Sequence, residues 1–223
     1  MKVTYLGHAS FKIEADGKTI FVDPWLNGPT SPIKVADVSK ADLCLVTHDH
    51  GDHGYVEAVE ICKKTGATFI AINELGLKAK QDGVEHVHTL NIGGSVEVDG
   101  ITITLVHAFH SCSLGAPTGF IVNMPSGTFY HSGDTGLFGD MKLFGELYSI
   151  DLFFVPIGSY YVMGIKEAAK AVELVAPKVA IPMHYDTFPV IAANAKQFYQ
   201  KVTDKGQSKV EIMKPGDSKE IAF

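Results

Sequence analysis

Three histidines and two aspartates lie within six consecutive residues of this 223-residue chain, inside the stretch THDHGDHGY at residues 47–55. Packed together as cations, such groups would repel one another. Buried as neutral groups, they would need many hydrogen-bond partners. A divalent cation removes both problems, because neutral imidazoles and carboxylates all donate to it. The cluster therefore predicts a metal site.

The spacing within this stretch predicts how its ligands divide. His48 and His50 can reach one ion together, whereas Asp52 and His53 lie further along and would point at a second ion. Two ions about 3.5–4 Å apart form the clamp that many hydrolytic enzymes use. The stretch contains no cysteine, which argues against a structural zinc site rich in thiolates. One or two divalent ions are expected. Zn²⁺ and Mn²⁺ are favoured, and Fe²⁺ and Ni²⁺ are compatible with the same donors.

Other histidines and aspartates stand where predicted strands end. A single histidine in such a place is more often a hydrogen-bonded structural residue than a ligand. Side chains on loops at strand ends can nevertheless converge at one edge of a sheet, where sites are commonly built. Six residues share this position: Asp23, His107, His110, His131, Asp134 and His184.

The elements that must position these side chains follow from hydrophobic periodicity and turn signals. Strands are expected at residues 2–8, 11–15, 18–25, 41–47, 67–72, 95–109 (a hairpin turning at Asp99–Gly100), 118–124, 128–134, 151–158 and 178–185, with two short strands near the end. Helices are expected at 55–66, 74–83, 165–177 and 190–206, and Val56, Val59 and Cys62 should face inward from the first of them.

Each half of the chain thus has a β-rich stretch followed by strand–helix units. This layout predicts an α/β (α+β) fold: a four-layer αββα sandwich of two mixed β-sheets flanked by helices. No linker or low-complexity segment divides the chain, so residues 1–223 are expected to form a single domain.

Composition narrows the classes of partner. The net charge of −6 disfavours a broad nucleic-acid surface, so nucleic acid is not the expected partner. No run approaches the roughly 18 apolar residues of a membrane helix, and the N-terminus lacks the apolar core of a signal peptide. A cytoplasmic protein with a small-molecule substrate is expected, and a homo-oligomer is left open. Cys44, Cys62 and Cys112 are interpreted as small core residues rather than a disulfide framework.

Four motifs together resemble the metallo-β-lactamase superfamily: H-x-H-x-D-H at 48–53, HAFHS at 107–111, SGDTG at 132–136 and PMHY at 182–185. The resemblance implies the αββα fold and a two-metal site. His48, His50 and His110 would bind the first ion, Asp52, His53 and His184 the second, and Asp134 would bridge them. His107 is an alternative third ligand of the first ion. His110 is preferred because Ser111 follows it, as the family pattern requires.

Within that superfamily the chain is most similar to small hydrolases like the L-ascorbate-6-phosphate lactonases, through LGHASF (6–11), VDPW (22–25), YHSGDTGLFGDM (130–141) and IPMHYDTFP (181–189). The resemblance implies that a metal-bound hydroxide hydrolyses a small phosphorylated lactone or a phosphodiester. A nuclease acting on short RNA or DNA and a metal-binding protein without catalysis are the alternatives. SYYVMG at 159–164 departs from the pattern of this branch and leaves the substrate open.

Four further residues receive candidate roles. Asp52 could accept the proton of the attacking water, in addition to binding metal. His8 could donate a hydrogen bond or act as an acid, and His131 could flank the bridging carboxylate; for both, a purely structural role is equally compatible. Asp23 is a candidate acceptor for the free N–H of a metal-binding imidazole.

Several large side chains are predicted near the loops of the site. Trp25, Tyr160, Tyr161 and Met163 could form a wall for a sugar or a base. Packing of these side chains on the core is the favoured interpretation.

Overall fold

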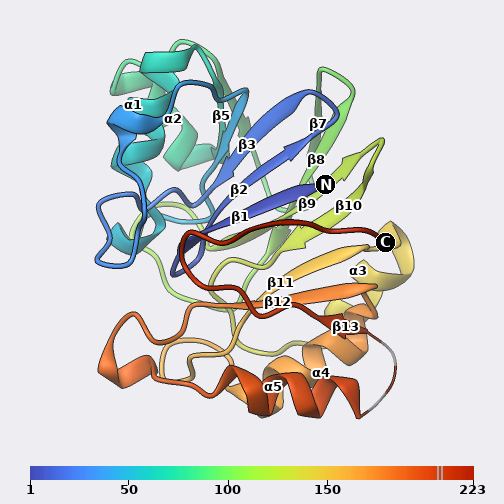
Figure 1. Cartoon of the computed structure of the whole chain (residues 1–223). Helices are drawn as coiled ribbons and strands as arrows, with labels where there is room; N and C mark the ends of the chain where they lie inside the picture. Colours follow the sequence, from blue (N-terminus) through green and yellow to red (C-terminus); the bar gives the residue numbers. More distant parts are fainter. Residues whose placement is uncertain (205, 207) are drawn as a thin grey trace.

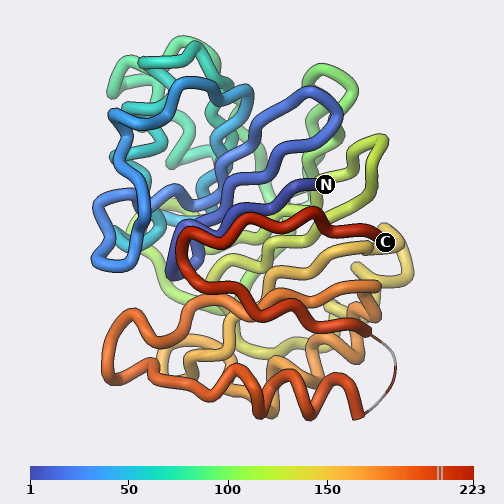
Figure 2. Tube along the Cα trace, viewed as in Figure 1, coloured from blue at the N-terminus to red at the C-terminus, as the bar shows by residue number. Residues whose placement is uncertain are grey.

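The computed structural model describes residues 1–204, 206 and 208–223, and places fourteen strands and five α-helices in them. The strands form two seven-stranded sheets that face each other (Figure 1). The predicted αββα sandwich of two mixed sheets is therefore confirmed. The termini lie close together on one side of the molecule (Figure 2).

The first sheet has the strand order β14-β1-β2-β3-β4-β5-β6. Its strands are β1 (Lys2–Gly7), β2 (Ser10–Ala15), β3 (Lys18–Val22), β4 (Leu43–Leu45), β5 (Thr68–Ile72), β6 (Val87–Leu90) and β14 (Ser218–Glu220). The pairs from β14 to β3 are antiparallel and those from β3 to β6 are parallel. Helix α1 (Tyr55–Thr65) joins β4 to β5 and helix α2 (Asn73–Gln81) joins β5 to β6, and both cover the outer face (Figure 1).

The second sheet has the order β13-β12-β11-β10-β9-β8-β7 and the same division into two halves. Its strands are β7 (Ser95–Val98), β8 (Ile101–His107), β9 (Thr118–Met124), β10 (Gly127–His131), β11 (Leu152–Pro156), β12 (Val179–Met183) and β13 (Lys209–Val210). Its parallel strands are joined by α3 (Met141–Tyr148), α4 (Ile165–Val175) and α5 (Ala195–Thr203). Figure 1 shows α4 and α5 covering the outer face of this sheet.

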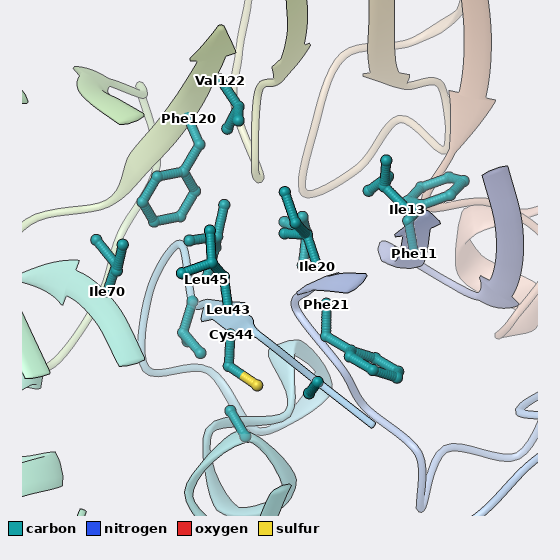
Figure 3. Packing of buried hydrophobic residues seen from close by; sticks show 14 of the residues in the cluster. Phe11, Ile13, Ile20, Phe21, Leu43, Cys44, Leu45, Ile70, Phe120 and Val122 are labelled. Carbon is teal, nitrogen blue, oxygen red and sulfur yellow. The ribbon is translucent and has the colours of Figure 1, made fainter. Parts of the chain in front are cut away.

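Alternation along the strands fills two hydrophobic layers. Figure 3 shows Leu43 and Leu45 turned toward Phe120 of the opposite sheet, while Cys44, between them in sequence, points the other way, toward a helix. This period of two is what a strand buried on both faces requires. Each buried leucine or phenylalanine contributes about 1.5–3 kcal/mol relative to an exposed one. A second layer of buried side chains lies around α3, α4 and α5.

Two expectations for single residues in these layers need correction. Val56 was expected to face inward, but it is 59% exposed, because the buried stripe of α1 runs through Ala58, Val59, Ile61 and Cys62. Cys112 lies half-exposed on a loop instead of in the core, although all three cysteines are free, as expected.

The last predicted helix was expected at 190–206 and begins five residues later. Asn194 caps α5 by accepting hydrogen bonds from the backbone N–H groups of Lys196 and Gln197, and a 3₁₀ turn, Pro189–Ile191, precedes it. The helix ends at Thr203, three residues before the expected end at residue 206; residue 205, within the expected helix, lies outside the described residues. None of the described helices is long and apolar enough to cross a membrane.

Candidate metal centre

The first ligand cluster consists of three imidazoles. His48, His50 and His110 place one ring nitrogen each within 4.8 Å of the others. Nε2 of His48 lies 3.0 Å from Nδ1 of His50, and the His110 ring stands edge-on to both other rings. His48 and His50 follow β4 in the first sheet, whereas His110 follows β8 in the second. The cluster therefore forms only when the two sheets face each other.

The second ligand cluster contains a carboxylate. Asp52, His53 and His184 lie within the same 4.8 Å limit, together with His8. Asp52 and His53 belong to the short 3₁₀ helix Gly51–His53, and His184 follows β12. Asp52 is the most accessible carboxylate of the centre, with 28% of its side chain exposed, whereas His53 and His184 are buried.

Asp134 connects the two clusters. Its Oδ1 lies 3.3 Å from Nε2 of His53, and its Oδ2 lies 3.0 Å from Nε2 of His184 and 3.6 Å from Nε2 of His110. The carboxylate is buried at the end of β10. A single side chain between two ligand sets is the arrangement that a two-ion centre needs.

Asp23 and Thr47 orient the imidazoles of His48 and His53 through contacts to their Nδ1 atoms. Oδ2 of Asp23 lies 2.7 Å from Nδ1 of His53, and the same carboxylate accepts hydrogen bonds from the backbone N–H and the hydroxyl of Thr47. The Thr47 hydroxyl also lies 3.1 Å from Nδ1 of His48. A carboxylate on one ring nitrogen fixes the tautomer and leaves the other nitrogen free for a metal. Thr47 is a further residue of the centre that was not predicted; its only signal in the sequence is its position directly before H-x-H-x-D-H.

His8 contacts two members of the second cluster. Its Nε2 lies 3.1 Å from Oδ2 of Asp52, and its ring centroid is 4.0 Å from that of His184. Its carbonyl oxygen accepts a hydrogen bond from the backbone N–H of His184, and its Nδ1 lies 2.9 Å from the hydroxyl of Thr187. His8 is buried behind these residues. Its place suits a residue that holds Asp52 and His184 in position.

The catalytic role considered for His131 does not fit the structure. Nδ1 of this buried ring accepts a hydrogen bond from the backbone N–H of Gly133, so Nε2 carries the proton and donates to the carbonyl of Ala9. Both ring nitrogens are therefore engaged by backbone. His131 is a structural residue that braces the turn leading to Asp134.

The alternative ligand His107 lies apart from both clusters. Its Nε2 lies 3.7 Å from Oδ2 of Asp140, and its ring packs against Phe138 and Phe144. The structure instead places His110 beside His48 and His50. His107 is the last residue of β8, so its direction is set by the strand, whereas the loop that follows carries His110 into the centre.

Several residues of the centre have left-handed backbone conformations. His8, Asp23 and His184 have φ values of 56°, 46° and 54°, which cost non-glycine residues on the order of 1–3 kcal/mol each. Gly133 also has a positive φ, and a Cβ there would lie 2.4 Å from the carbonyl oxygen of Thr118. These sharp turns at the strand ends direct the side chains to one point.

The buried acidic and imidazole groups around the second cluster shift one another's pKa values. Burial disfavours the imidazolium of His53, but Asp134 and Asp23 outweigh this and hold its pKa well above the ordinary value. Burial likewise raises the pKa of Asp134, yet His53 and His184 hold it well below its ordinary value. In the first cluster burial lowers the pKa of His48 and His110, so both are neutral near pH 7 and able to donate.

Unpaired buried atoms show that the donors fit a cation. Nε2 of His53 and Oδ1 of Asp134 lie 3.3 Å apart, yet neither has a hydrogen-bond partner among the described residues. Nδ1 of His184 is also buried and unpaired there. Leaving such atoms unsatisfied costs about 1–3 kcal/mol each. Imidazole and carboxylate together match Zn²⁺ or Mn²⁺, so these residues could hold divalent ions.

Comparison with known proteins gives concordant results. Residues 2–184 match the model of the beta-lactamase superfamily domain. A UPF0173 metal-dependent hydrolase from Methanopyrus kandleri is 49% identical over 230 residues, covering 99% of this chain and 100% of the relative. One from Staphylothermus marinus is 47% identical over 97% of each chain.

Solved structures agree with these relatives. The metallo hydrolase Igni18 from the hyperthermophilic archaeon Ignicoccus hospitalis superposes with a TM-score of 0.94 at 41% identity, covering 100% of this chain and 98% of that one. A putative metal-dependent hydrolase from Parabacteroides distasonis gives a TM-score of 0.76 at 25% identity, over 96% of this chain and 93% of that one.

Proposed function

Since the chain belongs to the beta-lactamase superfamily and is a metal-dependent hydrolase, we propose that it hydrolyses a small lactone or phosphodiester at a centre holding two divalent ions. The observation that carries this proposal is the position of Asp134, whose two oxygens contact imidazoles of both clusters. Mononuclear sites have no need for a carboxylate shared in this way.

Seven side chains would hold the ions. His48, His50 and His110 form one ligand set, Asp52, His53 and His184 form the other, and Asp134 is common to both. Zn²⁺ and Mn²⁺ are the proposed ions. When bound, they would make water nucleophilic near neutral pH and polarise the carbonyl or phosphoryl oxygen of the substrate.

Asp52 is the residue that we assign to proton transfer. It is the carboxylate of the centre most accessible from solvent, whereas Asp23 and Asp134 are buried against imidazoles. One of its oxygens contacts His8, which leaves the other to accept a proton as water attacks. His8 would hold Asp52 in the orientation that this transfer requires.

The lactone and the phosphodiester need the same metals and the same proton acceptor. A lactonase should hydrolyse a panel of γ- and δ-lactones with little turnover of bis-p-nitrophenyl phosphate, and a phosphodiesterase should show the reverse. A phosphate group on the substrate is one group through which the protein could bind it.

The experiment combines elemental analysis of the purified protein with this substrate screen. We expect about two divalent ions per chain, loss of hydrolysis on chelation and recovery with Zn²⁺ or Mn²⁺. His48→Ala should lower kcat/KM by at least about a hundredfold, because ligand loss removes several kcal/mol of charge stabilisation. A protein that holds no metal and is unaffected by His48→Ala would refute the proposal.

Asp52→Asn separates metal binding from proton transfer in the same screen. Removal of a general base costs about 10²–10⁴-fold in rate. A variant that keeps its metal and its full kcat would exclude the role assigned to Asp52, while leaving the two-ion centre intact.

A further inference from the structure

The loop of residues 158–163 lies between the loops that carry Asp134 and His184. At one end, a Cβ on Gly158 would lie 2.2 Å from the carbonyl oxygen of His184, so the two backbones touch. At the other end, the backbone N–H of Met163 donates to the carbonyl of Thr135, 3.0 Å away, and Thr135 follows Asp134. Residues between these ends are therefore held beside both metal-binding loops.

The backbone of this loop is strained and closed on itself. Ser159 and Tyr160 are consecutive non-glycine residues with φ values of 60° and 61°. The N–H of Ser159 donates to the carbonyl of Met163, and the N–H of Tyr161 donates back to the carbonyl of Ser159. Such conformations cost on the order of 1–3 kcal/mol each and cluster at functional sites. Here the backbone hydrogen bonds fix the part of the loop that carries Tyr160 and Tyr161.

The two tyrosines point away from the core. Tyr160 is 73% exposed and Tyr161 is 56% exposed, with their ring centroids 4.7 Å apart at an angle of 81°. The expectation that these side chains pack on the core is thus wrong for both, although Met163 is buried. Two adjacent exposed rings on a strained loop form an apolar surface that folding does not require.

Three other aromatic side chains stand on loops around the centre; Phe109 and Phe188 are exposed, and Trp25 is half-buried. Phe109 is 62% exposed, directly precedes the ligand His110, and accepts a hydrogen bond at its carbonyl from Gly136. Trp25 and Phe188 lie 6.1 Å apart, and each ring lies within about 6 Å of the His8 ring. We call these five residues the aromatic rim: Trp25, Phe109, Tyr160, Tyr161 and Phe188.

The charged residues of the chain are not suited to binding an anionic group, such as phosphate, on the substrate. All 19 basic residues are lysines, so no arginine is available for the bidentate grip that commonly holds phosphate. Beside the ligands, Asp49 is hydrogen-bonded to the backbone of Ser113, and Asp186 lies two residues after His184. These carboxylates would repel an anion approaching along the rim.

We propose that Tyr160 and Tyr161 form a stacking platform for an uncharged ring of the substrate, so that the molecule hydrolysed is a neutral, ring-bearing lactone or ester. This inference rests on the proposed hydrolytic function and narrows its substrate. The two tyrosines determine specificity: they bind the part of the substrate that does not react.

Two lactones with the same scissile bond test the platform. The double variant Tyr160→Ala/Tyr161→Ala should lower kcat/KM for γ-phenyl-γ-butyrolactone by about tenfold or more, mainly through KM, because each aromatic contact is worth a few-fold in affinity. Turnover of γ-butyrolactone should stay within about twofold of wild type. The double variant Tyr160→Phe/Tyr161→Phe keeps both rings and should retain the preference for the phenyl lactone. Tyr199→Ala, which removes an exposed tyrosine on α5, is the matched control.

A binding measurement separates this inference from the proposed function. Saturation-transfer NMR of 1-phenylethanol on the protein as purified should show transfer from protein to the phenyl ring in wild type and in Tyr199→Ala, and its loss in the double alanine variant. If wild type hydrolyses neither lactone while this binding persists, the proposed function fails and the platform stands. The platform is overturned if the ring does not bind, if both lactones slow equally in the alanine variant, or if the phenylalanine variant also loses the preference. Equal melting temperatures exclude a folding defect.

Discussion

The two ligand clusters differ in how the protein holds them. The first, His48, His50 and His110, contains only imidazoles, and two of its members are half-exposed. In the second, Asp52 contacts His8, His53 contacts Asp23, and the backbone of His184 donates to His8. The second cluster therefore has a hydrogen-bonding contact to each of its three members, whereas in the first the Thr47 hydroxyl contacts His48 and the rings otherwise contact one another and Asp134.

The braces of the second cluster come from the antiparallel half of the first sheet. His8 follows β1 and Asp23 follows β3, while the ligands come from 3₁₀, loop and strand-end positions of the parallel half and of the second sheet. The comparison teaches that one half of the sheet supplies ligands and the other supplies the residues that orient them. The second site should accordingly be the more selective of the two and the more sensitive to distant substitutions.

The largest effect should come from removing the shared residue. Asp134→Ala should abolish tight binding of both ions and lower kcat/KM by about a thousandfold or more, because the charge stabilisation from each ion is worth several kcal/mol. Elemental analysis and titration with Zn²⁺ measure the result. Asp140→Ala removes a nearby carboxylate that pairs with His107 and should keep both ions. Retention of one ion at full affinity in Asp134→Ala would show that the clusters are independent.

A smaller and selective effect is expected from Asp23→Asn. The amide cannot accept from His53 and Thr47 as the carboxylate does, so affinity for the second ion should fall by about 10–100-fold while the first ion stays bound. Competition with a chromogenic chelator resolves the two affinities. Asp42→Asn is the control, because Asp42 also accepts a backbone N–H from a neighbouring strand but lies outside the ligand clusters. An equal loss of affinity for both ions would contradict the proposed difference between the two clusters.

The smallest expected effect is a difference between the two clusters in the number of protons released when metal binds. In metal-free protein the pKa of His53 lies above its ordinary value, so this residue is protonated near pH 7, whereas burial lowers the pKa of His48 and His110. Binding at the second cluster should therefore release a proton, and affinity there should rise with pH until the raised pKa is passed. Binding at the first cluster should release almost none from these two residues. Calorimetry in buffers of different ionisation enthalpy counts the protons, and equal release at both steps would oppose the prediction.

Much of the fold was predictable because the strands and most helices carry clear periodicity. Two elements were missed. β6 is a half-exposed edge strand whose pattern is weak. α3 contains Gly145, which lowers helix propensity by about 1 kcal/mol. Glycine is needed at this position for tertiary packing. A Cβ on residue 145 would lie 2.3 Å from the carbonyl oxygen of Val175, so glycine permits close packing against the end of α4.

The candidate site was predictable where ligands are close in sequence or match a motif. The hydrogen bonds that join His8 to Asp52 and Asp23 to His53 span 44 and 30 residues, so no local pattern encodes them. For His131 the sequence suggested a role that the structure does not support. This histidine stands beside a ligand motif, but both of its ring nitrogens are hydrogen-bonded to backbone groups. Exposure of Tyr160 and Tyr161 depends on a strained turn that residue types alone do not reveal.

The pairing of β14 with β1 governs how the molecule can assemble. Lys2 pairs with Glu220 and Thr4 with Ser218, so β1 pairs with a strand more than 200 residues later in the chain (Figure 2). On the ribosome, the edge of β1 stays open until residue 220 has emerged, and an open edge invites pairing with other chains. Since His184 is also synthesised late, neither the first sheet nor the candidate metal centre can be completed before the last part of the chain has been made. Folding of this chain should therefore be a single late event, slow for its size because its contacts join distant residues.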